Sequence, residues 1–220
     1  MSANTGTNGC VYDTLLNVAD IETHSVSNGP SVRFVIWVQG CPFRCHGCSN
    51  GDFLEFRPAQ LMPVSLLTSR ILDTPGIEGI TLSGGEPMSQ AEALVKLVSP
   101  LKSAGLSVVC FSGYTVEELQ MSSNPWQTRL LKLIDILIDG RYVSSQPGAG
   151  LTGSRNQKVH YLTNRYSEAA EKLQEGKVLE VKSGQNEMVV TGVFESEIFR
   201  RVQRALESGP RKLIQLDSEE

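Results

Sequence analysis

The sequence lacks long apolar runs and segments dense in basic residues. No apolar stretch among its 220 residues approaches the roughly 20 that a membrane-spanning helix needs, so no membrane partner is expected. The formal net charge is −4 and the basic residues form no stripe, so nucleic acid is not favoured as a partner. Residues 1–8 are small and polar and have no basic or apolar signal segment, and the expected location is therefore the cytoplasm.

The cysteines do not form the pairs that a disulfide framework would need. There are five of them, and an odd number in a chain of this length without a secretion signal indicates a reducing compartment. Cys10 and Cys110 lie far from the other three and are interpreted as ordinary buried or tolerated thiols. The chain also lacks internal repeats, and its 40% hydrophobic and 20% charged residues are typical of a globular protein with one sizeable core.

The other three cysteines share one window, residues 41–48, with the spacing C-x3-C-x2-C, directly after the apolar run 32–38. Three closely spaced thiolates can hold a four-iron cluster and leave one iron open to another ligand. The alternative is a structural zinc site, but zinc ligands usually come as two pairs. His46 lies between two of the cysteines, where its ring is poorly placed to share their metal. The spacing therefore favours an iron–sulfur cluster.

Strand-like and helical patterns alternate along the middle of the chain. Such alternation predicts βαβ units with right-handed crossovers. There are too few units for an eight-fold barrel, so the expected fold class is α/β, with a partial (open) βα barrel. Strands are predicted at 32–38, 79–83, 106–111 and 134–138, and helices at 63–72, 91–104 (bent or interrupted at Pro100), from a capping box at 115–118, and at 126–133.

Three parts are expected along the chain: a flexible N-terminal segment (1–25), a core (26–168) and a small C-terminal appendage (169–220). In the appendage, the alternating stretches 177–182 and 187–193 flank a polar turn, which predicts a β-hairpin. A final amphipathic helix follows. Its apolar face is formed by Phe199, Val202 and Leu206.

A glycine-rich turn, Ser83-Gly84-Gly85-Glu86-Pro87, follows the predicted strand 79–83. Ligands of parallel α/β folds bind at the carboxyl ends of strands. Two glycines let the backbone approach a ligand closely, and the carboxylate of Glu86 could pair with an ammonium group. Polar segments around Ser112, Asp139 and Asn156 also adjoin predicted strands. For Asp139, a catalytic role and a role in capping or turning the chain remain equally open.

The cysteine window and the glycine-rich turn together resemble the radical S-adenosylmethionine (SAM) enzymes. The full set of segments is similar to the activating proteins of anaerobic ribonucleoside-triphosphate reductases, over roughly residues 28–165. Many radical SAM enzymes carry an aromatic residue before the third cysteine, whereas Gly47 stands there, as in the reductase activases. The matching segments are Asn28-Gly29-Pro30, Cys41-x3-Cys45-His46-Gly47-Cys48-Ser49-Asn50, Gly84-Gly85-Glu86-Pro87, Ser112-Gly113-Tyr114-Thr115, Asp135-x3-Asp139-Gly140-Arg141 and Gly153-Ser154-x-Asn156-Gln157.

The resemblance implies a [4Fe–4S] cluster, with SAM bound at its open iron. The implied cluster ligands are Cys41, Cys45 and Cys48. The backbone around Gly47 would lie near the adenine of SAM, and Gly84, Gly85 and Glu86 would hold its methionine end. The further implied SAM contacts are Ser112, Asp139 and Asn156.

The implied activity is reductive cleavage of SAM to a 5′-deoxyadenosyl radical, which would take a hydrogen from a glycine of a large glycyl-radical enzyme. A flavodoxin- or ferredoxin-type protein would supply the electron. One alternative is a radical SAM enzyme that modifies a peptide or small metabolite. A second is a non-catalytic iron–sulfur electron carrier, which is disfavoured because three ligands leave an exposed iron and because the glycine-rich turn would have no task.

Overall fold

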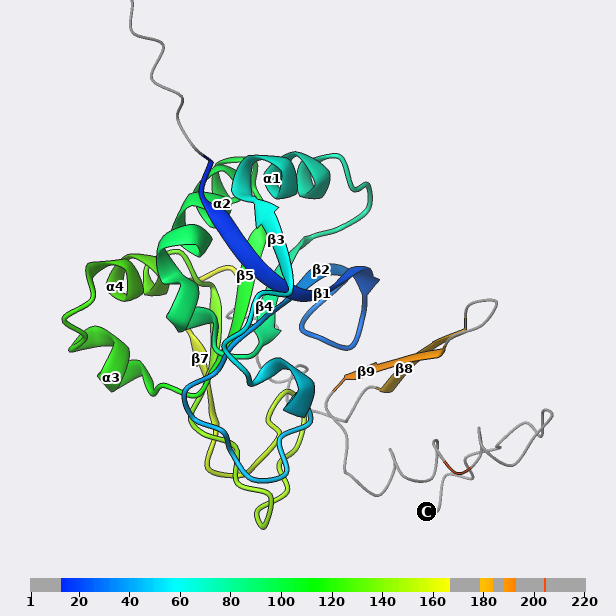
Figure 1. Ribbon diagram of the computed structural model, residues 1–220, viewed down its shortest axis with the longest axis vertical. Coiled ribbons are helices and arrows are strands. Elements are labelled where there is room, and N and C mark those ends of the chain that lie inside the picture. Colours follow the sequence, from blue (N-terminus) through cyan, green and yellow to red (C-terminus); the bar gives the residue numbers. More distant parts are fainter. Residues whose placement is uncertain (1–12, 167–178, 184–187, 193–203, 205–220) are drawn as a thin grey trace, which may run out of the picture.

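The computed structural model describes residues 13–166, 179–183, 188–192 and residue 204. Its main body is an open seven-stranded sheet with helices packed against one face (Figure 1). The mixed α/β class with an open sheet is thus confirmed. The strand order is β3-β1-β2-β4-β5-β6-β7.

Four neighbouring strands of the sheet run parallel: β2 (Arg33–Val38), β4 (Gly79–Gly84), β5 (Ser107–Ser112) and β6 (Ile136–Asp139). Because they are parallel, their carboxyl ends meet at one edge of the sheet. Antiparallel strands flank them on both sides. These are β1 (Leu15–Ser25), β3 (Gln60–Pro63) and β7 (Lys158–Tyr161).

Within residues 13–166, four α-helices pack in a row on the same face of the sheet (Figure 1). They are α1 (Val64–Leu72), α2 (Ala91–Ser103), α3 (Val116–Gln120) and α4 (Pro125–Leu131), with 3-10 turns at Gly51–Phe53 and Pro87–Gln90. Each lies close to its predicted position, and the capping box of Thr115 and Glu118 is present. The helix α2 continues through Pro100. Of the two expectations for that position, a bend or an interruption, the interruption is therefore wrong and the bend stays a prediction. None of the described helices is both long and apolar enough to span a bilayer.

The parallel strands are buried on both faces, which explains their continuous apolar runs. One set of alternate side chains, such as Ile80 and Leu82, packs against the helices. The opposite face carries a smaller cluster without helical residues. That second cluster consists of Val109, Ile136, Ile138, Leu151 and Tyr166.

The prediction of a flexible segment over residues 1–25 is wrong for residues 15–25, which form the strand β1. Residues 15–18 pair with β3 and residues 18–25 with β2. Leu16 and Val18 point into the core and are fully buried. The pairing with β2 shifts register between Val18 and Asp20. This shift interrupts the two-residue alternation by which a half-buried strand is recognised in a sequence. Residues 1–12 lie outside the described chain, and the three-part division itself stays a prediction.

Two strands lie where the C-terminal hairpin is expected. β8 (Leu179–Ser183) and β9 (Met188–Gly192) pair antiparallel, with Leu179 opposite Gly192 and Ser183 opposite Met188. The carboxylate of Glu180 accepts hydrogen bonds from the Ser25 hydroxyl (2.8 Å) and the Val26 amide (3.1 Å). The pair of strands therefore contacts the turn between β1 and β2. The predicted helix with Phe199, Val202 and Leu206 lies outside the described residues.

Replacing Leu16 by alanine should test whether β1 belongs to the core. Leu16 is fully buried, whereas its neighbour Leu15 is 49% exposed. Leu16→Ala should lower the free energy of unfolding by about 2–5 kcal/mol, and Leu15→Ala by no more than about 0.5 kcal/mol. Urea titration of the two variants measures the difference. Equal effects would contradict the packing of β1 described above.

Candidate functional site at the carboxyl edge of the sheet

The cysteine loop begins directly after β2, at the carboxyl edge of the sheet. Cys41 is buried, and Cys45 and Cys48 are partly exposed. The amide of Gly40 donates to the Phe53 carbonyl (2.8 Å), and that of Cys41 to the Leu54 carbonyl (2.9 Å). The 3-10 turn that follows the loop therefore fixes its first cysteine.

Burial around Cys41 and Cys48 favours the neutral form of these two thiols. It raises the pKa of Cys41, while the backbone amides of Phe43 and Arg44 act in the opposite direction. Burial likewise raises the pKa of Cys48, opposed by the Asn50 amide. Hydrogen bonds from amides to sulfur also help to set the potential of iron–sulfur clusters.

The described residues contain no group of three His, Cys, Asp or Glu side chains that could hold a metal ion in the present arrangement. A structural zinc ion needs four ligands converging on one centre. A four-iron cluster instead spreads its thiolates over separate irons, so the cysteines can lie further apart. The donor set of this loop, three closely spaced thiols, fits a four-iron cluster with one open iron.

The glycine-rich turn lies against the start of the cysteine loop. The Gly85 amide donates to the Val38 carbonyl (2.7 Å), and the Glu86 amide to the Gly40 carbonyl (2.8 Å). A Cβ on Gly85 would lie 2.3 Å from the Gly40 oxygen. The missing side chain at Gly85 thus allows β4 to approach the loop after β2, whereas the sequence suggested room for a ligand. The Asn50 side chain donates to the Gly84 carbonyl (3.1 Å) and adds another link.

Glu86 is 1% exposed, and its carboxylate faces donors of the turn after β4 and of the end of β5. Oε1 accepts hydrogen bonds from the Met88 amide and the Ser112 hydroxyl, both at 2.9 Å. Oε2 accepts from the Gly113 amide at 2.8 Å. Burial raises the pKa of Glu86 to about 7, against the lowering effect of these three donors. The side chain therefore joins the end of β4 to the end of β5.

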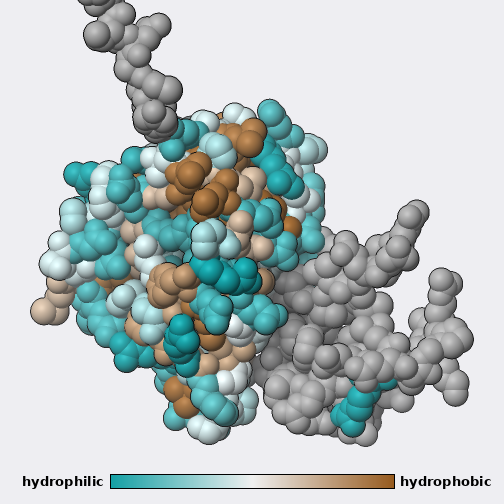
Figure 2. Space-filling view, in the orientation of Figure 1, coloured by the Kyte–Doolittle hydropathy of each residue, from teal (hydrophilic) through white to brown (hydrophobic). Residues whose placement is uncertain are grey.

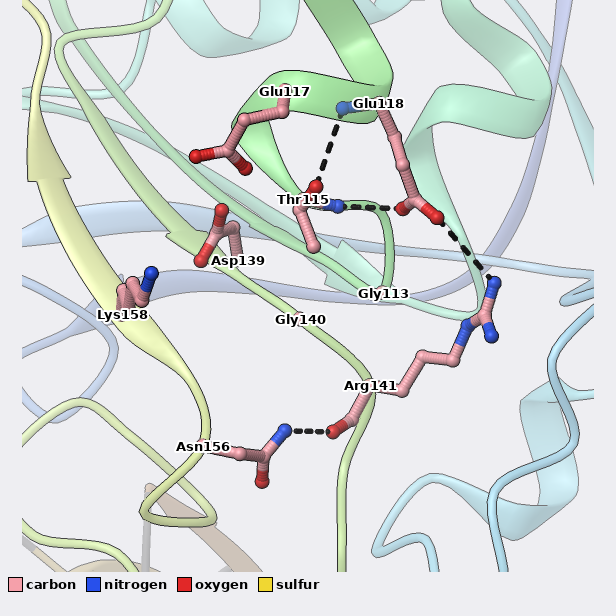
Figure 3. Close-up of a pocket in the computed structure, with 9 residues that line it drawn as sticks. All are labelled: Gly113, Thr115, Glu117, Glu118, Asp139, Gly140, Arg141, Asn156 and Lys158. Carbon is pink, nitrogen blue, oxygen red and sulfur yellow. Dashed lines mark hydrogen bonds and ion pairs between the residues drawn. The ribbon is translucent and has the colours of Figure 1, made fainter.

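A pocket of about 260 Å³ opens beside this link, at the ends of β5 and β6 (Figure 3). Two of its residues, Asp139 and Asn156, are expected from the sequence. Lys158 ends the polar segment around Asn156 and is not among the site residues predicted from the sequence. The walls of the pocket carry charges of both signs. They are formed by Gly113, Thr115, Glu117, Glu118, Asp139, Gly140, Arg141, Asn156 and Lys158.

Asp139 and Asn156 line the pocket and also hold its walls together. Asp139 is 3% exposed, and its Oδ2 accepts from the Val116 amide at the start of α3 (2.7 Å). The same oxygen lies 3.0 Å from Nε2 of His160 on β7. The Asn156 side chain donates to the Arg141 carbonyl (2.7 Å; Figure 3). Asp139 thus does serve as a cap, one of the two roles left open by the sequence.

Phe43 connects the cysteine loop to the pocket. Its ring meets the Tyr114 ring edge to face at 4.7 Å, and the Arg141 guanidinium lies 4.6 Å from its centre. A Cβ on Gly113 would come within 2.4 Å of the same ring. The sequence reasoning missed this role, although Phe43 is an aromatic residue between the first two cysteines.

The remaining expected residues divide between the two ends of the sheet. Gly47 lies near the loop after β6, where a Cβ on it would be 3.3 Å from Ser144. The Asn28-Gly29-Pro30 segment lies at the opposite end, before β2, where the Asn28 carbonyl accepts from Thr81 (2.7 Å). All the predicted cluster and SAM residues therefore lie at the carboxyl edge, and the Asn28 segment belongs to the scaffold.

Comparison with known proteins matches residues 27–160 to the family described as "4Fe-4S single cluster domain". The anaerobic ribonucleoside-triphosphate reductase-activating protein of Vibrio cholerae is 33% identical over 148 residues, covering 63% of this chain and 93% of that protein. The protein of the same name from Enterobacteria phage T4 is 32% identical, with 60% and 85% covered. The pyruvate formate-lyase-activating enzyme of Listeria monocytogenes is 28% identical, with 70% and 66% covered.

Replacing Gly85 by alanine should disturb the cysteine loop directly, because the added Cβ would meet the Gly40 carbonyl. We expect a loss of about 1–3 kcal/mol in the free energy of unfolding and weaker retention of iron after reconstitution. Gly51→Ala is the matched control, since a Cβ there meets nothing within 4 Å. Thermal unfolding and iron content measure both effects. Equal iron retention and stability in the two variants would rule out this packing role.

The raised pKa of Glu86 predicts a pH-dependent stability of the cluster-free protein. Its folded pKa, about 7, lies above the ordinary value of 4.5. Its contribution to stability is therefore fully present below about pH 4.5 and is lost as the pH rises to about 7. Relative to Glu86→Gln, which does not titrate, the wild type should lose on the order of 3 kcal/mol across that window. Urea titrations at a series of pH values measure the difference, and a flat difference would contradict the shift.

Proposed function

We infer the function of this chain from its family: it belongs to the 4Fe-4S single cluster domain family and, within it, to the anaerobic ribonucleoside-triphosphate reductase-activating proteins. The function is activation of a glycyl-radical enzyme by radical SAM chemistry. The observation that carries it is the meeting of the C-x3-C-x2-C loop and the Gly84–Glu86 turn at one edge of a parallel sheet. That edge also carries the pocket of about 260 Å³.

The cluster would be held by Cys41, Cys45 and Cys48, and SAM would take the open iron. When bound, the two cofactors supply reductive cleavage of SAM to methionine and a 5′-deoxyadenosyl radical. The chain's own residues position the reactants and exclude water. We assign the methionine end of SAM to the backbone of the Gly84–Gly85 turn and the adenine end to the backbone around Gly47.

The pocket beside this turn supplies further contacts in the proposal. Asp139 and Asn156 would face the ribose or methionine groups of SAM. The contacts they make with Val116 and Arg141 fix their positions before any ligand arrives. Such preorganisation lowers the entropic cost of binding. Burial under SAM would also strengthen the electrostatic contacts at the site.

The finer features of the fold belong to the same proposal. The parallel strands β2, β4, β5 and β6 would curve into a partial barrel of the radical SAM type, with the pocket at its carboxyl mouth. Residues 26–168, extended by β1, would form the core, and residues 169–220 an appendage. A barrel closed by only part of the full set of strands leaves a side through which a loop of another protein can reach the radical.

The favoured substrate is a backbone glycine of a large glycyl-radical enzyme, most specifically an anaerobic ribonucleotide reductase. The reductase-activating proteins of Vibrio cholerae and phage T4 match over 93% and 85% of their own length, whereas the pyruvate formate-lyase-activating enzyme of Listeria monocytogenes matches over 66%. A flavodoxin- or ferredoxin-type donor would supply the electron, and the cytoplasm would hold all three proteins. The alternative is modification of a peptide or small metabolite, with the C-terminal appendage as the element that recognises it.

Deuterium transfer tests the proposed substrate. Cluster-loaded, reduced protein is incubated with SAM and an anaerobic ribonucleotide reductase whose glycines carry deuterium on Cα. We expect a glycyl radical in the EPR spectrum and one deuterium in the 5′-deoxyadenosine formed. Cys45→Ala should abolish SAM cleavage, whereas Cys110→Ala, which alters a buried thiol of the core, should retain it. Label that came only from an added peptide or metabolite would overturn the activase role, and absence of SAM cleavage would leave the electron carrier in its place.

A further inference from the structure

The Glu86 carboxylate collects donors from two separate strand ends. The Met88 amide belongs to its own turn, whereas the Ser112 hydroxyl and the Gly113 amide belong to the end of β5. Glu86 also reaches a third strand end through its backbone, because its amide donates to the Gly40 carbonyl beside Cys41. A single residue thus links the cysteine loop after β2, the turn after β4 and the pocket wall after β5.

The direction of each hydrogen bond is fixed by chemistry. Two of the donors are backbone amides, which cannot accept. The third, the Ser112 hydroxyl, itself accepts from the Tyr114 amide (3.1 Å), so its single proton is directed to Glu86. The site therefore needs a side chain with two accepting oxygens. A glutamine would place its NH₂ group against at least one N–H donor, in a position from which water is almost excluded.

We propose that Glu86 and Ser112 act together as positioning residues. They set the spacing between the glycine turn, to which the methionine end of SAM is assigned, and the Gly113 wall of the adjoining pocket. The inference rests on the proposed function for its ligand. It differs from the ammonium contact that the sequence suggests for Glu86, because here the carboxylate acts through the backbone of Gly113. Ser112 likewise acts through Glu86 and not as a contact of its own.

The position of Gly113 affects both the pocket and the cysteine loop. Gly113 lines the pocket and also packs against Phe43 of the cysteine loop. A displaced Gly113 amide would therefore shift the pocket wall and the support of that loop at once. Misplacement by about 1 Å in a reacting site is enough to cost about a hundredfold in rate.

The first test needs no cofactor. Amide hydrogen exchange is followed by NMR in the cluster-free wild type, in Glu86→Gln and in Glu92→Gln. Glu92 is the matched control because it lies on the exposed surface of α2 in an ion pair with Lys96. In Glu86→Gln we expect exchange at Gly113 and Met88 to quicken at least about tenfold, whereas Glu92→Gln should match the wild type. Unchanged exchange in Glu86→Gln overturns the proposal.

The second test measures SAM affinity of the cluster-loaded protein by equilibrium dialysis. Glu86→Gln and Ser112→Ala should each raise the dissociation constant, the former by about tenfold. The double variant should be no weaker than Glu86→Gln alone, because residues that act through one link are not additive. Additive losses, or an unchanged constant in Ser112→Ala, would show separate contacts and overturn the joint role. A wild type that holds the cluster but binds no SAM would instead overturn the proposed function, and the exchange rates would still decide whether Glu86 links the strand ends.

Discussion

The site depends on hydrogen bonds that join the carboxyl ends of neighbouring parallel strands. The main-chain ladder fixes the strands themselves, but it ends where the loops begin. Beyond that point the buried carboxylate of Glu86 connects β4 to β5, and that of Asp139 connects β6 to the start of α3 after β5. At the β7 edge of the sheet, the Gln157 side chain donates to the Gly140 carbonyl (2.8 Å) and connects the end of β6 to the start of β7. Each acceptor is buried or partly buried, where an unmade hydrogen bond is costly.

A residue at the end of a parallel strand can therefore have two roles. A residue at the end of a parallel strand is well placed to touch a ligand, and it is also the nearest group that can hold the next loop. Ser112 and Asp139 both hold the neighbouring loop, through the hydrogen bonds with Glu86 and Val116. A motif at a strand end thus preserves the geometry of a site even where its side chain does not reach the ligand.

The amino end of the sheet is built in a different way. Arg33 is fully buried there, and its guanidinium donates to Thr81 Oγ1 (2.8 Å), the Ser107 carbonyl (3.1 Å) and other oxygens. Burial lowers the pKa of Arg33, and nearby Tyr166 and Glu78 oppose that effect. A buried charge of this kind is tolerated because its donors are satisfied. Polar groups thus join the strands at both ends of the sheet, and the apolar layers lie between them.

Much of the fold could be predicted from the sequence, because the four parallel strands are continuous apolar runs and most of the helices carry an apolar face or a cap. β1 could not, because a register shift near Val18 hides its alternation. The strand β3 (Gln60–Pro63) has only four residues, all partly or fully exposed at the edge of the sheet. It is too short to show a buried run or an alternating pattern in the sequence.

For the site, the spacing of the cysteines identified the loop, since the chemistry of a cluster dictates that pattern. The spacing of residues in a motif does not determine the direction in which a side chain points. The sequence placed Glu86 at the correct strand end but assigned its carboxylate to a ligand, whereas burial and three donors turn it inward. Phe43 was missed for the same reason, because its partners Tyr114 and Arg141 come from loops distant in the chain. Long-range partners of this kind follow from the order of strands in the sheet.

The glycines of the site show why that order matters. Gly85 is needed because the Gly40 carbonyl lies where its side chain would be, and Gly113 because the Phe43 ring does. Both neighbours belong to the cysteine loop. The loop is therefore pressed against the ends of β4 and β5 by contacts that no larger residue could make. The start of the loop is fixed further by the hydrogen bonds of Gly40 and Cys41 to Phe53 and Leu54, so the position of its first cysteine follows from the packing of backbone against backbone.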